Sequence, residues 1–230
     1  MLAVRRIGSE VLDDPAAPTG IVEASLRNIA RSNRWFGGAA AFRYGLARVL
    51  RARARRRTLT LLDLGTGFGD LPRGAVSWGA RRGLRIVPLG LELSPVAARL
   101  ARARGLPTVV GCAGAPPLAD KSVDLVSMCM VAHHFEPESV VELVRVCDRV
   151  ARIGVVICDL RRSRLAAAAF RLGSRVLRFD PVTVADGLTS IRRGYSRAEL
   201  AALLARAGVQ ARVVERPGWR LVATWRPEAA

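Results

Sequence analysis

The sequence contains few of the residues that mark the more unusual classes of protein. It has four cysteines in 230 residues and no Cys-x-x-Cys spacing, so neither a disulfide scaffold nor a metal site is expected. No apolar run approaches the roughly 20 residues that cross a bilayer, and the first residues lack the apolar segment of a secretory signal. Lys121 is the one lysine among 37 basic residues. These absences favour a reduced, cytoplasmic globular protein.

The basic excess is the one extreme property of the composition. The formal net charge is +18, whereas the hydrophobic fraction of 50% is ordinary for a globular chain. Such a charge can indicate an anionic partner, for example nucleic acid or a membrane surface. It can also reflect codon usage, because arginine replaces lysine almost throughout and alanine is frequent. We favour codon usage and do not expect nucleic acid as a partner.

From residue 58 onward, short apolar runs alternate with helical stretches. This alternation predicts an α/β fold with a mostly parallel sheet and helices on both faces. The expected strands are Thr58–Leu64, Arg85–Leu91, Thr108–Val110, Val123–Met130 and Arg152–Asp159, and the expected helices cover about 69–82, 95–104, 137–150 and 197–207. Near the C-terminus, Val209–Val214 and Trp219–Trp225 flank a short turn, which forces an antiparallel pair. The sequence therefore predicts seven strands that end in an antiparallel hairpin.

Two segments lie outside this alternation. Residues 1–57 predict an N-terminal helical cap, in which one helix runs to Asn33 and a second ends in the arginine-rich run 51–57. Residues 161–195 predict a lid, inserted into a core domain that spans residues 58–230.

The first part of the lid predicts a helix with two distinct faces. One face carries Arg164, Arg171, Arg175 and Arg178, and another carries Leu165, Ala169, Leu172 and Val176. We favour an ordinary lid whose arginines are solvated. The alternative is a weak contact of helix 161–178 with an anionic surface or an acidic carrier protein.

The most informative stretch is LLDLGTGFGDLP, residues 61–72, in which an apolar strand leads into a helix through three glycines. Glycines here let the backbone turn sharply and approach a ligand at the helix N-terminus. Asp70 stands where a dinucleotide fingerprint has its third glycine, and no P-loop lysine follows. The carboxylates of Asp63 and Asp70 would repel a pyrophosphate, but they suit a ligand that carries ammonium and sulfonium charges.

The loop DLGTGFGD resembles motif I of the class I S-adenosylmethionine-dependent methyltransferases, and the terminal hairpin is also typical of that fold. The resemblance covers residues 59–160 and 196–226, and it is similar in style to the small-molecule methyltransferases of ubiquinone and menaquinone biosynthesis. It implies a Rossmann-like fold, S-adenosylmethionine as cofactor, and methyl transfer to an aromatic, quinone-like or polyketide-like metabolite. The cofactor contacts that it implies are Asp63, Gly65, Thr66, Gly67, Gly69, Asp70, Glu92, Leu93, Cys112, Ala113 and Met128.

Two positions of the implied cofactor site differ in how well they match the family. Glu92 ends the second strand, 25 residues after Gly67, where an acid can accept hydrogen bonds from both ribose hydroxyls. Cys112 stands where the family has an acid for the adenine amino group, and a thiol is a poor acceptor. Adenine recognition would then depend on the backbone near Ala113 and on apolar contact with Leu93.

His133 and His134 are the only histidines, and they follow the fourth strand, whose end faces the methyl donor. The resemblance implies that a histidine binds the acceptor or removes its proton, and histidine is a suitable base near neutral pH. We rank His134 above His133; the alternative is that both only cap the junction between strand and helix. The expected substrate contacts are Trp35, Arg193 and Tyr195, together with Asp186 and Arg192.

Two other functions stay open on the sequence alone. The charge suggests an RNA methyltransferase, although SMCMVAHHF lacks the Asp/Asn-Pro-Pro-Tyr/Phe motif of enzymes that methylate base amines. A non-catalytic cofactor-binding protein of the same fold is the other, because a fold does not by itself establish catalysis.

Overall fold

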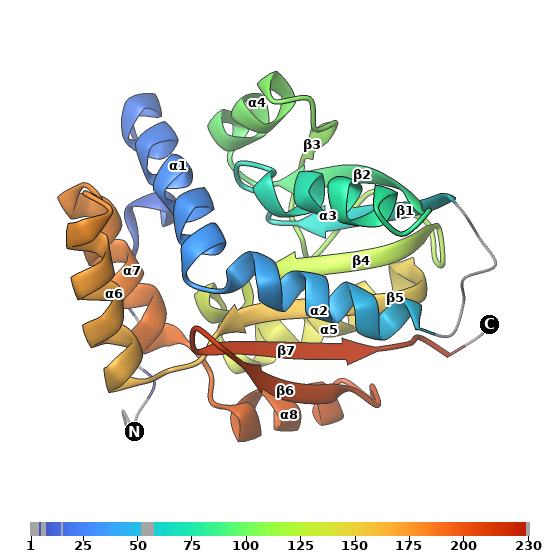
Figure 1. Cartoon of the computed structure of the whole chain (residues 1–230). Helices are drawn as coiled ribbons and strands as arrows, with labels where there is room; N and C mark the ends of the chain where they lie inside the picture. The colour runs from blue at the N-terminus through green and yellow to red at the C-terminus, as the bar shows by residue number, and fades with distance from the viewer. Residues whose placement is uncertain (1–4, 6–7, 15, 52–57, 229–230) are drawn as a thin grey trace.

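Seven strands form one sheet in the computed structural model, which describes residues 5, 8–14, 16–51 and 58–228 (Figure 1). The strands are β1 (Thr58–Leu64), β2 (Arg85–Glu92), β3 (Thr108–Val110), β4 (Val123–Cys129), β5 (Ala151–Leu160), β6 (Arg212–Arg216) and β7 (Arg220–Trp225). Their order is β3-β2-β1-β4-β5-β7-β6. Strand β7 is antiparallel to β5 and β6, and the other pairs are parallel. The mostly parallel sheet with a C-terminal antiparallel hairpin is confirmed.

The helices also follow the predicted alternation. They are α1 (Thr19–Trp35), α2 (Gly38–Leu50), α3 (Asp70–Ala80), α4 (Pro95–Ala103), α5 (Pro137–Val150), α6 (Arg164–Val176), α7 (Pro181–Arg193) and α8 (Arg197–Arg206), with 3-10 turns η1 (Val11–Asp13) and η2 (Ala132–His134). Strand β6 begins later than predicted because the Val209 N–H donates to the Leu204 carbonyl and closes the end of α8. The arginine-rich run in which α2 was expected to end lies outside the described residues from position 52 to 57.

Helices cover both faces of the sheet, as its consecutive apolar strand residues require. On β1, Leu59 and Leu61 pack with α2 and α3, whereas Leu62 and Leu64 pack in the cluster that includes α5 and α8. Phe42 and Leu46 of α2 are fully buried, so this helix of the expected N-terminal cap is a layer of the core. None of the helices in the described part of the chain is long and apolar enough to cross a membrane.

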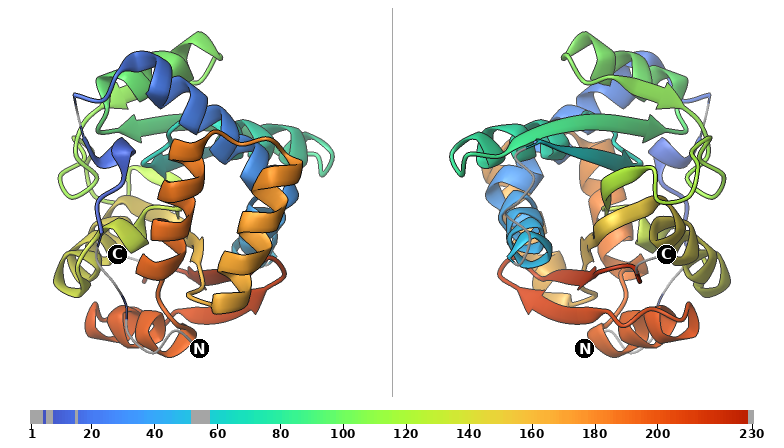
Figure 2. Two further views of the ribbon diagram at one scale, coloured as in Figure 1. Left: turned by 90° about the vertical axis from the view of Figure 1, so that its left-hand side faces the viewer. Right: turned by 90° about the vertical axis from the view of Figure 1, so that its right-hand side faces the viewer.

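The strand order places a natural binding cleft between β1 and β4. From β1 the chain moves outward to β2 and β3, and it then returns to β4 on the other side of β1. The loops that leave the carboxyl ends of β1 and β4 therefore diverge, which opens a crevice at that edge. Figures 1 and 2 show α1, α6 and α7 standing at this end of the sheet.

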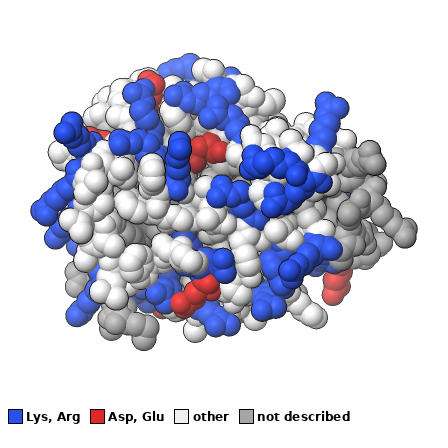
Figure 3. Space-filling model, viewed as in Figure 1, with Lys and Arg blue, Asp and Glu red and all other residues white. Residues whose placement is uncertain are grey.

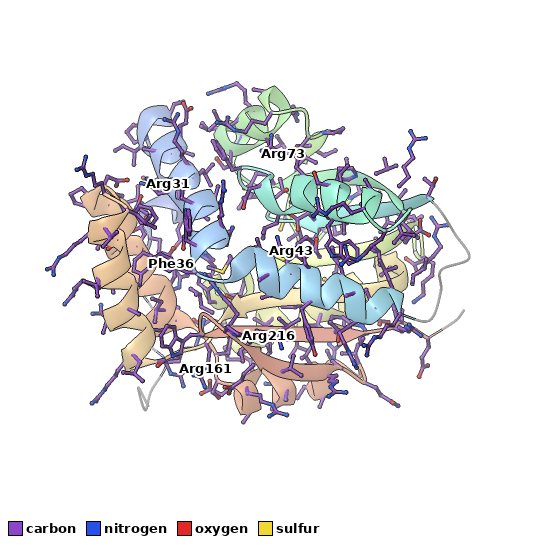
Figure 4. The ribbon with its side chains drawn as sticks, in the orientation of Figure 1. Arg31, Phe36, Arg43, Arg73, Arg161 and Arg216 are labelled. Atoms are coloured by element: carbon purple, nitrogen blue, oxygen red, sulfur yellow. The ribbon has the colours of Figure 1, made fainter. Side chains whose placement is uncertain are left out.

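Contacts between α1 and the lid join the two segments that lie outside the predicted core pattern. The Arg31 guanidinium donates to the Leu177 carbonyl at 2.6 Å and stacks over Phe179, and Phe36 packs edge-on against Phe170. Figure 4 shows Arg31 and Phe36 between α1 and the lid helices. The lid thus rests on α1 as well as on the end of β5, where Leu160 packs with Ala166 and Ile191.

We predict that Gly45→Ala lowers the free energy of unfolding by about 1–3 kcal/mol, because the added methyl group would overlap the Val156 side chain on β5. Gly74→Ala in α3 is the matched control, since open space surrounds that position. Alanine there should stabilise the helix by about 0.5–1 kcal/mol. Urea unfolding of both variants measures the difference, and equal shifts would contradict the close approach of α2 to the sheet.

Candidate functional site

A cavity of about 560 Å³ lies at the carboxyl ends of β1, β2 and β4. Its wall also includes residues of η1, α1 and α7, which close it on the side away from the sheet. Apolar side chains form much of the wall, and the charged groups that it contains are mostly carboxylates. In Figure 3, basic side chains cover much of the visible face, whereas a small acidic group lies in a hollow. The cavity is thus acidic in a strongly basic protein.

The glycine loop after β1 forms one side of the cavity. Gly65, Gly67 and Gly69 have φ values of +66°, +53° and +71°, in the left-handed region that glycine adopts without strain. A Cβ atom at Gly65 would lie 2.5 Å from Val131, so a larger residue would also collide with the loop after β4. The Gly65 N–H donates to the Leu91 carbonyl at 2.8 Å, which fixes the loop on β2.

A buried carboxylate, Asp63, and a half-buried one, Asp70, flank this loop. Asp63 accepts hydrogen bonds from the Ser127 hydroxyl at 2.6 Å and the Thr66 hydroxyl at 2.9 Å. Burial nevertheless raises the pKa of Asp63 to about 7. Burial also raises the pKa of Asp70, which accepts a hydrogen bond from the Asn33 amide at 3.1 Å. A cationic ligand group here would stabilise both carboxylates in their ionised forms.

Glu92 connects the glycine loop to the end of β2. Its carboxylate accepts hydrogen bonds from the Gly67 N–H at 2.7 Å and the Ser94 N–H at 3.0 Å. Leu93, Cys112 and Ala113 continue the wall beyond it, and the Leu93 side chain is 71% exposed. This end of the cavity therefore offers hydrogen-bond acceptors beside an apolar surface, a combination that suits a nucleoside.

His133 lies in the cavity wall below the end of β4 and is almost fully buried. Its Nδ1 atom lies 2.6 Å from Asp159 Oδ1, at the end of β5. Burial opposes ionisation of Asp159, but His133 and two backbone N–H groups lower the pKa of that carboxyl. An ionised carboxylate only accepts, so Nδ1 carries the proton and Nε2 has a free lone pair. His133 Nε2 has no hydrogen-bond partner among the described residues.

His134 is more exposed and is held by a second carboxylate. Its Nδ1 atom lies 2.7 Å from Asp13 Oδ1 of η1, and its ring lies 4.3 Å from the ring of His133. Burial raises the pKa of the neighbouring Glu10 carboxyl. Although burial opposes it, hydrogen bonds from His134 and Arg193 lower the pKa of Asp13.

Arg193 neutralises this group of acids. Its guanidinium donates to Asp13 at 2.8 Å and Glu10 at 3.2 Å, and also to the carbonyls of His133 and His134. Ligand atoms of Glu10, His133 and His134 lie within 4.8 Å of one another, close enough to suggest a metal site. Arg193 already supplies Glu10 with the positive charge that a metal ion would bring, so we assign no metal to this group.

The structure brings most of the predicted site residues together. The cavity wall contains Asp63, Gly65, Thr66, Gly67, Asp70, Glu92, Leu93, Cys112, Ala113, His133, His134, Asp186 and Arg193. Gly69 is adjacent to the wall as the residue before α3.

Four expected contacts lie elsewhere in the structure. Met128 is fully buried in the core. The strand ends one residue later, and Met130, whose φ is +60°, lies in the cavity wall instead. Trp35 is 63% exposed and is not part of the wall. Tyr195 is buried and donates its hydroxyl to the Phe135 carbonyl, and Arg192 is exposed. These residues are therefore not placed to contact a ligand in the cavity.

Sequence reasoning missed Glu10, Asp13 and Asp159 as site residues. Asp159 was detectable in principle, because it is a lone acid in the apolar run VVICDL. Glu10 and Asp13 have no local signal of this kind, since the N-terminal segment reads as an ordinary polar tail.

Comparison with known proteins agrees with this arrangement. Residues 62–158 match the family model described as a methyltransferase domain. No curated protein matches the chain in sequence.

Solved structures of methyltransferases share the fold at low sequence identity. The chain is similar to PigF with SAH, with a TM-score of 0.64 and 17% identity over 96% of this chain and 63% of PigF. It is also similar to a SAM-dependent methyltransferase from Aquifex aeolicus, with a TM-score of 0.54 and 20% identity over 79% of this chain and 88% of that one. For magnesium protoporphyrin IX methyltransferase from Synechocystis, the TM-score is 0.55 and the identity 12%, over 81% and 82% of the two chains.

We predict that Arg193→Gln lowers the free energy of unfolding by about 3–5 kcal/mol, because it leaves Glu10 and Asp13 without their buried cation. Arg192→Gln is the matched control: its side chain is exposed, and the change should be within about 0.5 kcal/mol. Urea unfolding at neutral pH measures both values. Similar values for the two variants would show that Arg193 does not organise the cavity.

Proposed function

We propose that the chain, whose residues 62–158 match a methyltransferase domain, is a class I S-adenosylmethionine-dependent methyltransferase that methylates a hydroxyl group of a small, largely apolar metabolite. The observation that carries the proposal is the His133–Asp159 pair: His133 belongs to the wall of the cavity that contains the glycine loop, and its buried Nε2 atom has no hydrogen-bond partner among the described residues. An acceptor hydroxyl beside this atom would have both a base and a methyl donor within one enclosed space.

The residues at the β1–β2 side of the cavity fit S-adenosylmethionine. Asp63 and Asp70 would hold its cationic methionine end, with the backbone of Gly65 and Gly67 against it. Glu92 would accept hydrogen bonds from the ribose, and Leu93 would cover the adenine. Cys112 is exposed at that end and offers no strong acceptor, so we assign adenine binding to the backbone near Ala113.

When bound, S-adenosylmethionine supplies a methyl group activated by a sulfonium. The work of the protein is then to place an acceptor oxygen in line with that methyl group and to exclude water. His133 Nε2 would take the proton of the acceptor hydroxyl as the methyl group passes to the oxygen, and S-adenosylhomocysteine would be the leaving group. Asp159 stabilises the resulting imidazolium through the hydrogen bond to Nδ1. We therefore propose His133 as the base, and His134 as a positioning residue held by Asp13.

The charge distribution in the cavity favours an acceptor without phosphate groups. Among the residues that the structure describes, seven carboxylates line the cavity, namely those of Glu10, Asp13, Asp14, Asp63, Asp70, Glu92 and Asp186, against the one guanidinium of Arg193. Negative charge of this density would repel the backbone of RNA even though the outer surface is basic. One structural neighbour is named for a porphyrin substrate, which agrees with a small-molecule acceptor.

We predict that the affinity for S-adenosylhomocysteine rises about tenfold between pH 6 and pH 8, because Asp63 has a pKa of about 7 and only its ionised form attracts the ligand ammonium group. Calorimetric titration across this range measures the effect. Asp63→Asn should bind more weakly and lose the pH dependence. Glu92→Ala should weaken binding at every pH without removing the dependence, and a flat profile for the wild type would contradict the role of Asp63.

We predict that His133→Ala lowers kcat/KM by about 100-fold or more, the usual contribution of a positioned general base. Asp159→Asn should have an effect in the same direction, because it removes the group that fixes the tautomer of His133. His134→Ala serves as the control and should retain most of the activity. Release of S-adenosylhomocysteine with a panel of phenols and hydroxyquinones is the readout.

The reverse order, with His134→Ala inactive and His133→Ala active, would overturn the assignment of the base. Turnover of no phenol or hydroxyquinone by the wild-type protein would overturn the acceptor class. Binding of S-adenosylhomocysteine by every variant would show that the cofactor end of the cavity stays intact.

A further inference from the structure

A row of large apolar side chains lies uncovered on the outer surface of α6. Leu165, Leu172 and Val176 are 70%, 64% and 76% exposed, more than the other exposed large aliphatic side chains of the described residues except Leu93. Their spacing of seven and four residues places them on one face of the helix. Leu93 lies in the wall of the cavity, where a bound ligand would cover it. No element of the described chain covers the row on α6.

The exposed row is fixed by the packing of the opposite face. Ala166 and Ser174 are buried, and Phe170 packs against Phe36 and Phe179. A Cβ at Gly173 would collide with the Phe36 ring, so the helix approaches α1 closely on that side. An ordinary lid would turn its leucines inward. Here the small residues face inward and the leucines face solvent.

Arginines flank the apolar row along the whole helix. Arg164, Arg171 and Arg175 are exposed on an adjacent face, and Arg178 follows the end of the helix. No ion pair joins these four side chains to an acid in the described part of the chain, and α6 itself contains no acidic residue. Over α6, at the left of Figure 3, basic and uncharged side chains lie side by side.

We propose that α6 docks the protein on a membrane surface that contains anionic phospholipids. The helix is about 20 Å long and would lie in the plane of the headgroups, with Leu165, Leu172 and Val176 in the upper acyl region. The arginines would snorkel to the phosphates beside it.

Two features favour a lipid surface over a protein partner. Helix α6 lies at the left-hand edge of the ribbon in Figure 1 and faces the viewer in the left view of Figure 2, and a bilayer needs no complementary shape to cover its apolar row. A second copy of this chain would bring arginines of one helix toward those of the other, which costs free energy. Anionic headgroups complement both the apolar row and the arginines at once.

The proposal does not depend on the methyltransferase reaction, but it agrees with an apolar acceptor. Helix α6 packs on α7, and Thr183, Asp186 and Ser190 of α7 line the cavity. Docking through α6 would therefore hold the cavity-lining helix next to the lipid surface, from which an apolar molecule could enter.

Flotation of the full chain with vesicles tests the proposal directly. The vesicles are an equimolar mixture of phosphatidylglycerol and phosphatidylcholine, with phosphatidylcholine alone as the neutral control. The wild type should bind the mixed vesicles at near-physiological salt and bind the neutral vesicles far less. The triple variant L165S/L172S/V176S should lose binding about tenfold or more, because its apolar contact with the acyl region is removed. R164Q/R171Q/R175Q should show a similar loss.

Matched variants elsewhere on the surface distinguish vesicle binding through α6 from binding through the net charge of +18. Val87, Val109 and Val110 are 42%, 41% and 43% exposed on β2 and β3, and V87S/V109S/V110S should bind as the wild type does. R81Q/R85Q/R99Q removes three exposed arginines from other elements and should have a small effect. Thermal unfolding confirms that each variant folds, and binding of S-adenosylhomocysteine confirms an intact cavity.

Depth of insertion provides a second measurement. The fluorescence that L172W adds to that of the four native tryptophans should be quenched by brominated acyl chains, whereas the fluorescence that V109W adds should not. Equal vesicle binding by the wild type and L165S/L172S/V176S would overturn the proposal, because attraction would then come from the overall charge alone. Retention of the wild type by polyglutamate without binding to any vesicle would also overturn the proposal, because the partner would then be an acidic protein. So would a wild-type dimer in sedimentation that L165S/L172S/V176S abolishes, because the apolar row would then join two copies of the chain.

Discussion

The cavity depends on one buried cation, the guanidinium of Arg193 at the end of α7. It holds Glu10 and Asp13 from the N-terminal segment and the two carbonyls of the turn after β4. A buried charge must be paired and hydrogen-bonded to be tolerated, so these distant parts of the chain have a single favourable arrangement. The wall of the cavity opposite the sheet is therefore set by electrostatics as much as by apolar packing.

The two sides of the cavity are suited to different parts of one reaction. The β1–β2 side presents backbone turns and carboxylates, which can hold a flexible, partly cationic ligand without chemistry of their own. The β4–β5 side presents His133, held by Asp159, and its Nε2 atom has no hydrogen-bond partner among the described residues. Because parallel strands end at the same edge of the sheet, both sides converge within one enclosed space.

Opposite charges separate the interior of the site from the exterior of the protein. The formal charge is +18, yet the charged groups in the wall of the cavity are mostly carboxylates. A basic exterior and an acidic site favour different ligands, so overall charge says little about the substrate. On α6 the exterior charge supports a specific proposal, because arginines there flank exposed apolar side chains. That combination suits an anionic lipid surface rather than a small molecule.

The order of strands and helices, the terminal hairpin and the glycine loop follow from the sequence, because they depend on local periodicity and on backbone conformations that glycine alone adopts easily. Contacts between segments more than a hundred residues apart do not. The pairing of His134 with Asp13 and the inward turn of the small residues of α6 arise from packing, which no local pattern encodes. Sequence thus predicted the glycine loop and the acid at the end of β2, whereas tertiary structure decided which carboxylate holds each histidine and which face of the lid meets solvent.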